Sequence, residues 1–428
     1  MKIAVIGAGW AGLAAAVELA AQGHQLTVFE ASPHLGGRAR SFEHKKPEHK
    51  GLLLDNGQHI LLGAYHQSLR LMKQVGLTET DILLRLPLTL ETPGHLILHT
   101  PALSAPLHLL AGLISAQGLS LSERLTTLAF FAKLRLRNFK LGQDKTVAEL
   151  LGKQPAKVVQ LLWEPLCIAA LNTPVSIASA QVFLNVLRDS FSHRRTDSDM
   201  LLPRRDLSAV FPQAAARYVT EHGGNILSGT TVKSLRLQSN GIEIDGAHFD
   251  KAICAVAPHQ LAALVRDIPQ AETALNMVSK FSYQPIATVY LQYPSTVTLP
   301  SPMLGLSGGD AQWVFDRGAL CGQQGLIAAS ISTEGQYQKL SHDEVAMAVH
   351  RRLQALIKQL PSPEWHQVIV EKRATFACVA GLQRPANHTA HPHLFLAGDY
   401  TAGDYPATLE GAVRSGIKCA RLLNESPA

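Results

Sequence analysis

Cysteine is scarce in this chain, and the cysteines that occur lie too far apart to act together. The 428 residues contain no CxxC pair and only five cysteines, which are Cys167, Cys254, Cys321, Cys378 and Cys419. Zinc sites and disulfide frameworks both need cysteines at short, repeated spacings. The sequence therefore predicts neither a metal site nor a disulfide-stapled fold, and it favours a reducing compartment.

Charged residues are also scarce, at 17% of the chain, although cations exceed anions to give a formal net charge of +6. Such an excess can attract nucleic acid, an anionic membrane or an anionic substrate. Nucleic acid is not an expected partner, because no basic run is interleaved with aromatic residues on a recognisable module. Hydrophobic residues make up 46% of the chain, which is enough for a full globular interior.

An uninterrupted apolar run long enough to span a bilayer is missing as well. The longest stretch without Lys, Arg, Asp or Glu runs from Thr92 to Ser122, and it contains Pro93, Pro101 and Pro106. Proline breaks helices, so this stretch does not predict a membrane-spanning helix. A strand is expected from Lys2 onward, which leaves no room for a signal peptide. We expect a cytoplasmic protein and leave attachment to the inner face of a membrane open.

The first thirty residues carry the pattern of a nucleotide-binding βαβ unit. A short apolar strand, Lys2–Ile6, precedes a helical pattern over Ala11–Gln22, and Gln25–Phe29 alternates as a second strand. Glu30 ends that strand, where its carboxylate can accept hydrogen bonds from ribose hydroxyls. This arrangement predicts a dinucleotide site at the turn between the first strand and the helix.

That turn has the sequence Gly7-Ala8-Gly9-Trp10-Ala11-Gly12. Gly7 permits the tight turn, and Gly9 lets the backbone approach a pyrophosphate. Gly12 lets the helix pack closely on the strand, and the helix N-terminus stabilises the phosphate charge.

Two further segments point to FAD as the dinucleotide. Gly36-Gly37-Arg38 follows Glu30 closely, an extension typical of FAD-binding proteins related to glutathione reductase and the amine oxidases. Arg38 can offer a charge-assisted fork to the cofactor phosphates, or it can form a surface salt bridge instead. Near the C-terminus, a strand over His393–Ala397 leads into Gly398-Asp399, whose carboxylate can hold a ribityl hydroxyl or the pyrophosphate side. No second glycine motif of this kind occurs, so no separate NAD(P) domain is expected.

The order of patterns predicts an α/β fold that is discontinuous in sequence. We expect a Rossmann-type FAD-binding domain, glutathione reductase-like, made of residues 1–86, 203–268 and 381–428. We expect an α+β substrate domain inserted into it, with a helical part at 87–202 and a part of strands and one long helix at 269–380. Local expectations include a helix over Lys157–Leu171, a strand over Ile226–Leu237, a type I′ turn at Asn240-Gly241 and a helix from Pro406.

Several motifs resemble those of a known flavoprotein superfamily. Asp55–Tyr65 resembles the flavin-facing segment of plant-type phytoene desaturases, and Asp399–Val413 resembles their C-terminal flavin motif. Trp163–Leu166, Ala169–Pro174 and Ser179-Ala180 are more similar to the squalene-associated FAD-dependent desaturases, or hydroxysqualene dehydroxylases. The likeness spans nearly the whole chain and places it in the phytoene desaturase and amine oxidase superfamily.

Together, the motifs and the resemblance imply a set of cofactor contacts. These are Gly7, Gly9, Ala11, Gly12, Glu30, Gly37, Arg38, Gln58, His59, Val232, Gly398, Asp399 and Leu409.

The resemblance also implies a reaction, the reductive removal of the hydroxyl of hydroxysqualene to give squalene in hopanoid precursor synthesis. Acid-assisted loss of an allylic hydroxyl would leave a cation, to which N5 of reduced flavin would deliver hydride. The reaction consumes reduced FAD, so an electron donor of unknown identity is expected as a partner beside the isoprenoid substrate.

Candidate acids for this step are few. His59 lies in the flavin-facing segment, where an imidazole could protonate a leaving hydroxyl. The alternative is that His59 only contacts the cofactor. Asp404 and Tyr405 precede the C-terminal helix and either face the substrate or form an ordinary loop and cap. A third possibility is a pocket that works by placing an apolar chain and excluding water.

Residues 125–140 combine apolar side chains with cations and suit the collection of an insoluble isoprenoid from a membrane. The apolar members are Leu125, Leu128, Phe130, Phe131, Leu134, Leu136 and Phe139, and the cations are Lys133, Arg135, Arg137 and Lys140. Such a segment could lie in the bilayer interface. The alternative is a surface helix that buries its apolar face in the protein.

Three other functions remain as alternatives. A carotenoid desaturase would share the fold and substrate class, but its oxidised FAD would accept the hydride. An amine oxidase commonly places Tyr two residues before the Glu of the C-terminal motif, where this chain has Thr408 before Leu409-Glu410. A non-catalytic isoprenoid carrier like the Rab GDP-dissociation inhibitors would not need the complete set of flavin motifs.

Overall fold

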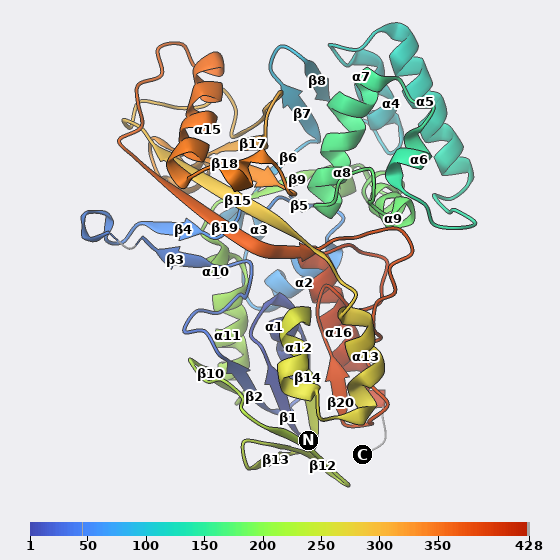
Figure 1. The fold of residues 1–428 in the computed structure, drawn as a ribbon, viewed down its shortest axis with the longest axis vertical. Helices are drawn as coiled ribbons and strands as arrows, with labels where there is room; N and C mark the ends of the chain where they lie inside the picture. Colours follow the sequence, from blue (N-terminus) through green and yellow to red (C-terminus); the bar gives the residue numbers. More distant parts are fainter. Residues whose placement is uncertain (45, 426–428) are drawn as a thin grey trace.

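A five-stranded parallel sheet forms the base of the molecule in the computed structural model, which describes residues 1–44 and 46–425. Its strand order is β10-β2-β1-β14-β20. The strands are β1 (Lys2–Ile6), β2 (Gln25–Glu30), β10 (Asn225–Ser228), β14 (Lys251–Cys254) and β20 (Leu394–Leu396). The sheet is therefore assembled from three stretches of chain separated by some hundreds of residues, and these stretches lie side by side in Figure 1.

The central strands are apolar along their length because helices cover both faces of the sheet. Ile3, Ala4 and Val5 of β1 are fully buried, as are Ala252 and Ile253 of β14. A continuous apolar run is the pattern expected of a parallel strand buried on both faces. The helices around this sheet are α1 (Trp10–Ala20), α11 (Pro212–Glu221), α12 (Pro258–Val265), α13 (Glu272–Val278) and α16 (Leu409–Glu425).

Helices α1 and α16 pack against each other at very short range. A Cβ atom on Gly416 would lie 2.2 Å from the backbone oxygen of Ala11 and 3.0 Å from Cβ of Ala14. Only a residue without a side chain allows this approach. The parallel pairing of the two helices brings the N-terminus of the C-terminal helix to the same edge of the sheet as the glycine turn.

A small antiparallel sheet of three strands follows β10 in the chain. Its structure shows that two local predictions are wrong. The expected strand over Ile226–Leu237 is two strands, β10 and β11 (Leu235–Gln238), which belong to different sheets. The hairpin to β12 (Gly241–Ile244) exists, but Asn240 has no positive φ, so its turn is not type I′. The turn with two positive φ angles is Asp245-Gly246, which leads to β13 (Ala247–Phe249).

An antiparallel sheet of five strands stands above the parallel one (Figure 1), with the order β16-β17-β18-β15-β19. Its strands are β15 (Tyr283–Gln292), β16 (Met303–Gly305), β17 (Ala311–Asp316), β18 (Leu326–Ser332) and β19 (Trp365–Phe376). Helix α15 (His342–Leu356) covers one face and buries Val345, Val349 and Leu353 against it.

The remaining elements surround this sheet, and the region 87–202 is less uniformly helical than predicted. Its helices are α4 (Leu107–Ser115), α5 (Leu121–Leu136), α6 (Val147–Leu151), α7 (Ala156–Val158), α8 (Glu164–Leu171) and α9 (Ala180–Phe191). It also holds the hairpin β7 (Thr89–Thr92) and β8 (Leu96–His99), and β9 (Met200–Pro203), which pairs with β5 (Leu61–Leu62) and β6 (Leu83–Leu86). These strands are too short for their alternation to stand out from the surrounding apolar pattern.

Shorter elements join these layers to the parallel sheet. They are β3 (Ser41–Glu43), β4 (Leu53–Asp55), α2 (His66–Gln74), α3 (Glu79–Ile82), α10 (Leu207–Val210) and α14 (Arg317–Cys321).

The helix predicted over Lys157–Leu171 is interrupted by a π-helical turn at Val159–Trp163, directly before α8. Pro165 lies just after that turn and has no N–H to donate to the preceding turn of helix. The wider turn accommodates the proline without ending the helical run.

The contact between α1 and α16 yields a stability prediction. We expect Gly416→Ala to lower the free energy of unfolding by about 1–3 kcal/mol, because the new methyl group forces two helices apart. Gly142→Ala is the matched control, since a Cβ at Gly142 meets nothing within 4 Å. Urea unfolding of both variants would measure the difference, and equal midpoints would contradict the close packing.

Candidate functional site

In the glycine turn after β1, two close backbone contacts leave no room for a side chain. Gly7 has φ +108°, and a Cβ there would lie 2.6 Å from the backbone oxygen of Ala255. A Cβ on Gly12 would lie 1.9 Å from the oxygen of Gly7. The turn therefore lies directly between β1, β14 and the first turn of α1, as the sequence predicts.

The backbone amides of this turn are available for an anion. Within the described residues, the N–H groups of Gly9, Ala11 and Gly12 donate to no protein acceptor. A Cβ on Gly9 would meet only Gly37, at 4.0 Å, so the backbone is open on that side. Free amides at the N-terminus of a helix, with no side chain in front of them, fit the pyrophosphate of a dinucleotide.

Glu30 organises this turn from the end of β2. Its carboxylate accepts hydrogen bonds from the N–H of Ala8, at 2.8 Å, and of Ser32, at 2.9 Å. The loop after β10 lies beside Glu30, because the N–H groups of Gly229 and Thr230 donate to the backbone oxygens of Ser32 and Glu30. The same loop carries the buried Val232. The structure thus places Val232 in the loop beside Glu30, and its contact to the cofactor stays a prediction.

Arg38 and Asp399 form an ion pair that joins the two ends of the chain. Nη2 of Arg38 donates to Asp399 Oδ1 at 2.7 Å, and Nη1 donates to the backbone oxygen of Ala374 at 2.8 Å. Burial opposes the charge of Arg38, but the carboxylate of Asp399, with smaller contributions from Glu371 and Tyr283, outweighs it, and the pKa of the guanidinium is raised. The guanidinium nitrogens of Arg38, which the sequence analysis offered to the cofactor phosphates, therefore donate to oxygen atoms of the protein. Gly37 and Gly398 directly precede the two members of this pair in the sequence, and their contacts to the cofactor stay predictions.

The segment before His59 is fixed by a buried network from the antiparallel sheet. Arg317 Nη1 lies 3.0 Å from Asp55 Oδ2, and both side chains are almost fully buried. The hydroxyl of Tyr290 accepts from Gln58 Nε2, at 2.8 Å, and donates to the backbone oxygen of Asp55. Burial raises the pKa of Asp55 to about 6, although Arg317 and the N–H of Leu207 oppose that change.

Sequence reasoning missed Tyr290 and Arg317 because neither belongs to a local motif. They lie 235 and 262 residues from Asp55, and only the folded sheet brings them to it.

His59 is held beside Gly57, whose Cβ would lie 3.4 Å from the imidazole Nε2. Burial, with the nearby charge of Arg38, lowers the pKa of His59 to about 4. The imidazole is therefore uncharged at neutral pH. This protonation state argues against the predicted role as an acid and suits the alternative, a contact to the cofactor.

Asp404 lies at the surface and not in an enclosed position. Its side chain is 66% exposed and faces Arg188 at 3.6 Å. Tyr405, by contrast, is buried, donates to Asp189 at 2.9 Å and stacks under Arg414. The exposed carboxylate does not have the enclosed surroundings that the predicted catalytic role of Asp404 requires.

Helix α16 begins at Leu409 and not at Pro406, because Thr408 caps it by accepting the N–H of Gly411. Leu409 is therefore the first helical residue. Glu410, next to it, is fully buried and accepts the N–H groups of Gln67 and Ser68 in the first turn of α2. The glutamate of this motif thus caps a second helix.

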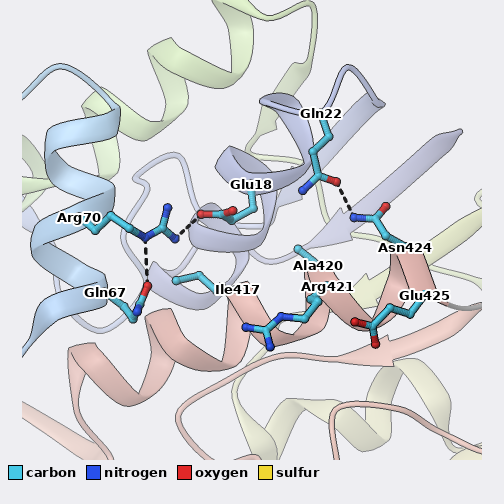
Figure 2. A pocket seen from close by; sticks show the side chains of 9 residues that line it. All are labelled: Glu18, Gln22, Gln67, Arg70, Ile417, Ala420, Arg421, Asn424 and Glu425. Carbon is cyan, nitrogen blue, oxygen red and sulfur yellow. Dashed lines mark hydrogen bonds and ion pairs between the residues drawn. The ribbon is translucent and has the colours of Figure 1, made fainter.

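Figure 2 shows a polar hollow of about 530 Å³ that lies apart from the glycine turn. It lies beside the C-terminal parts of α1 and α16, whereas the glycine turn lies at the N-terminal end of α1. Its lining residues are Glu18, Gln22, Gln67, Arg70, Ile417, Ala420, Arg421, Asn424 and Glu425. Ion pairing and amide contacts, such as Arg70 with Glu18, account for its polarity (Figure 2).

Comparison with known proteins identifies the family. The family described as flavin containing amine oxidoreductase matches residues 10–424. The chain belongs to this family. It is an FAD-dependent oxidoreductase, and the predicted α/β Rossmann-type fold and FAD cofactor are confirmed.

Individual proteins are similar to this chain over nearly its full length. A hydroxysqualene dehydroxylase from Zymomonas mobilis is 28% identical over 98% of both chains. A zeta-carotene desaturase from Solanum lycopersicum is 24% identical over 99% of this chain and 81% of its own. The crystal structure of an oxidoreductase from Methanosarcina mazei superposes with a TM-score of 0.74 at 17% identity, covering 98% of this chain and 100% of that one. That structural match speaks for the fold alone.

The Arg38–Asp399 pair leads to a binding prediction. We expect Asp399→Asn to weaken FAD binding about tenfold, because it removes the charge that compensates Arg38 beside the glycine turn. Fluorescence titration of the apoprotein with FAD would measure the dissociation constant. Asp343→Asn serves as the control, since Asp343 is 84% exposed on α15. An unchanged FAD affinity in Asp399→Asn would show that the pair does not support the site.

Proposed function

We propose that this enzyme removes the hydroxyl of hydroxysqualene reductively and releases squalene. The observation that carries the proposal is the near full-length similarity to hydroxysqualene dehydroxylase, at 28% identity over 98% of both chains. The inner motifs that resemble those enzymes, around Trp163 and Asn172, support it.

The position of Asn172 gives that motif a physical role. Asn172 ends α8 with φ +44°, and its side chain bonds Thr375 at 3.0 Å and the N–H of Thr333 at 2.9 Å. Thr173 accepts the N–H of Cys378 at 3.0 Å. These contacts join the end of α8 to the ends of β18 and β19. Buried apolar side chains of α8, α9 and the antiparallel sheet belong to one hydrophobic cluster. An apolar substrate suits such surroundings.

The reaction needs a proton on the leaving oxygen and a hydride on the carbon, with water as the second product. FAD supplies the hydride when it is bound and reduced, so a separate electron donor must restore the reduced form. The free amides of Ala11 and Gly12 would hold its pyrophosphate, and Gln58 and His59 would contact it from the segment fixed by Tyr290. The remaining contribution of the chain is to orient an apolar substrate and exclude water.

We expect that neither His59 nor Asp404 is the acid of the reaction. His59 is uncharged at neutral pH because its pKa is lowered to about 4, and Asp404 is open to solvent. With FAD at saturation, His59→Ala and Asp404→Ala should keep turnover within a few-fold of the parent. Removing a true general acid costs about 10²–10⁴-fold. A loss of that size in either variant, with full FAD occupancy, would identify the acid and refute this expectation.

The proposed reaction can be tested in a single turnover without knowledge of the electron donor. Anaerobic enzyme with chemically reduced FAD is mixed with hydroxysqualene, and flavin absorbance and products are followed. We expect flavin reoxidation together with one squalene per flavin. Reduced flavin that stays reduced, with no squalene formed, would contradict the proposal.

A carotenoid desaturase is the second candidate, because zeta-carotene desaturases align over 99% of this chain. In that reaction, oxidised FAD accepts the hydride. Mixing oxidised enzyme with an acyclic carotene would then bleach the flavin. The two experiments differ in the redox state of the starting enzyme, so they separate the two directions of hydride transfer.

A further inference from the structure

Helix α5 presents an apolar stripe to solvent. Leu121, Leu125, Ala129, Ala132 and Leu136 are all exposed, with Leu121 at 68% and Leu136 at 87%. Their spacings of four, four, three and four residues place them within an arc of about 80° on a helix that turns about 100° per residue. Single exposed leucines are common, but a contiguous stripe of exposed apolar side chains on one helix face marks an interaction surface.

The opposite face of α5 already packs against the protein. Its buried residues, Thr127, Phe131 and Leu134, lie on the other side of the helix from the stripe. The sequence left the seven apolar residues of 125–140 either to a membrane interface or to the protein interior, and the structure turns five of them toward the interior. Phe131, Leu134 and Phe139 are buried, and Leu128 and Phe130 are partly buried against the core. The exposed stripe is therefore a second apolar face of the helix.

The neighbouring helix α4 repeats the arrangement. Leu107, Leu110, Ala111 and Ile114 follow one face at spacings of three, one and three residues, with Leu107 at 52% and Ile114 at 57% exposure. Leu103, just before the helix, is 44% exposed. Residues 103–136 thus hold six of the eleven exposed large hydrophobic side chains found in the described part of the chain. We name these two faces together the α4–α5 surface.

Cations border the stripe on both sides. By the same 100° rotation, Lys133 and Arg137 lie on one side of it and Arg135 on the other. These three side chains and Lys140 are exposed, and none forms an ion pair with the described residues. No acidic residue occurs between Glu123 and Asp144, and Glu123 is engaged by Ser120 in a capping box.

We propose that the α4–α5 surface docks the protein on a bilayer that contains anionic lipid. Exposed leucines would insert at the level of the headgroups, and the bordering cations would meet lipid phosphates. No helix among residues 1–44 and 46–425 has the length and apolar character to cross a bilayer, so the contact is with one leaflet. A second copy of this chain fits the surface less well, because the same basic border would face itself without any acid to pair with.

Docking at this surface would bring the enzyme to the phase in which an isoprenoid dissolves. That purpose rests on the proposed function, whereas the surface itself rests on the exposure and charge of α4 and α5.

The test uses the full chain with FAD bound and measures flotation with vesicles in the absence of substrate. Vesicles of phosphatidylcholine alone are compared with vesicles containing phosphatidylglycerol. We expect the parent protein to float with the anionic vesicles. The variant Leu121→Ser/Leu125→Ser/Leu136→Ser should lose at least tenfold in partition coefficient, and Lys133→Gln/Arg135→Gln/Arg137→Gln should lose the preference for anionic lipid.

Controls come from exposed residues outside the surface. Leu340→Ser and Arg236→Gln change side chains of the same types, at 41% and 76% exposure, and should leave flotation unchanged. Flavin absorbance and melting temperature report whether each variant is folded.

Three outcomes would overturn the proposal. These are no flotation of the parent, equal flotation of the triple-leucine variant, or a dimer in solution that the leucine substitutions abolish without affecting flotation. Turnover of hydroxysqualene in detergent micelles is measured separately, so that an error about the membrane can be told from an error about the reaction.

Discussion

The first helix of this protein is held by contacts that exclude side chains, and the cofactor site depends on them. Gly12 lets α1 start directly on the turn after β1, and Gly416 lets α16 lie against the same helix. In each contact, backbone atoms of a neighbouring segment occupy the space that a Cβ atom would need. As a result, two helix N-termini, from opposite ends of the sequence, meet at one edge of the parallel sheet. The unpaired amides of Ala11 and Gly12 are a direct product of this packing.

Charge then links the two halves of the site. The Arg38–Asp399 pair connects the loop after β2 with the loop after β20, and Arg38 also reaches Ala374 at the end of β19. Tyr290 of the antiparallel sheet and Arg317, the first residue of α14, both bind the side chain of Gln58. Buried pairs of this kind contribute little net stability, but they restrict which arrangement the groups can adopt. The two layers of the molecule are therefore positioned against each other through residues of the predicted cofactor site.

The features predicted correctly from sequence are those encoded by neighbouring residues. The glycine turn, the strand that ends at Glu30 and the strand before Gly398 each lie within a few residues of the pattern that reveals them. Pairings across the chain, such as Tyr290 with Asp55, leave no local trace and could not be predicted. Local errors had local causes. Thr408 provides a cap that moves the start of α16 past Pro406, and Asp245-Gly246 adopts the turn that Asn240-Gly241 resembles in composition. Helix α5 has two apolar faces, so its sequence alone did not show which one is buried.

The dispersed origin of the parallel sheet has a consequence for biosynthesis. Its edge strand β20 and the helix α16 are the last elements to be made, while β1 is the first. The sheet is therefore complete only some 390 residues after β1 has been made. Its paired strands lie about 250 residues apart for β1 with β14 and about 140 for β14 with β20, and such separations slow the closure of long-range contacts. The intervening layers can begin to form as they emerge from the ribosome, but Asp399 reaches Arg38 only after nearly the entire chain has been translated. A chain truncated before residue 394 would therefore lack both β20 and the ion pair between Arg38 and Asp399.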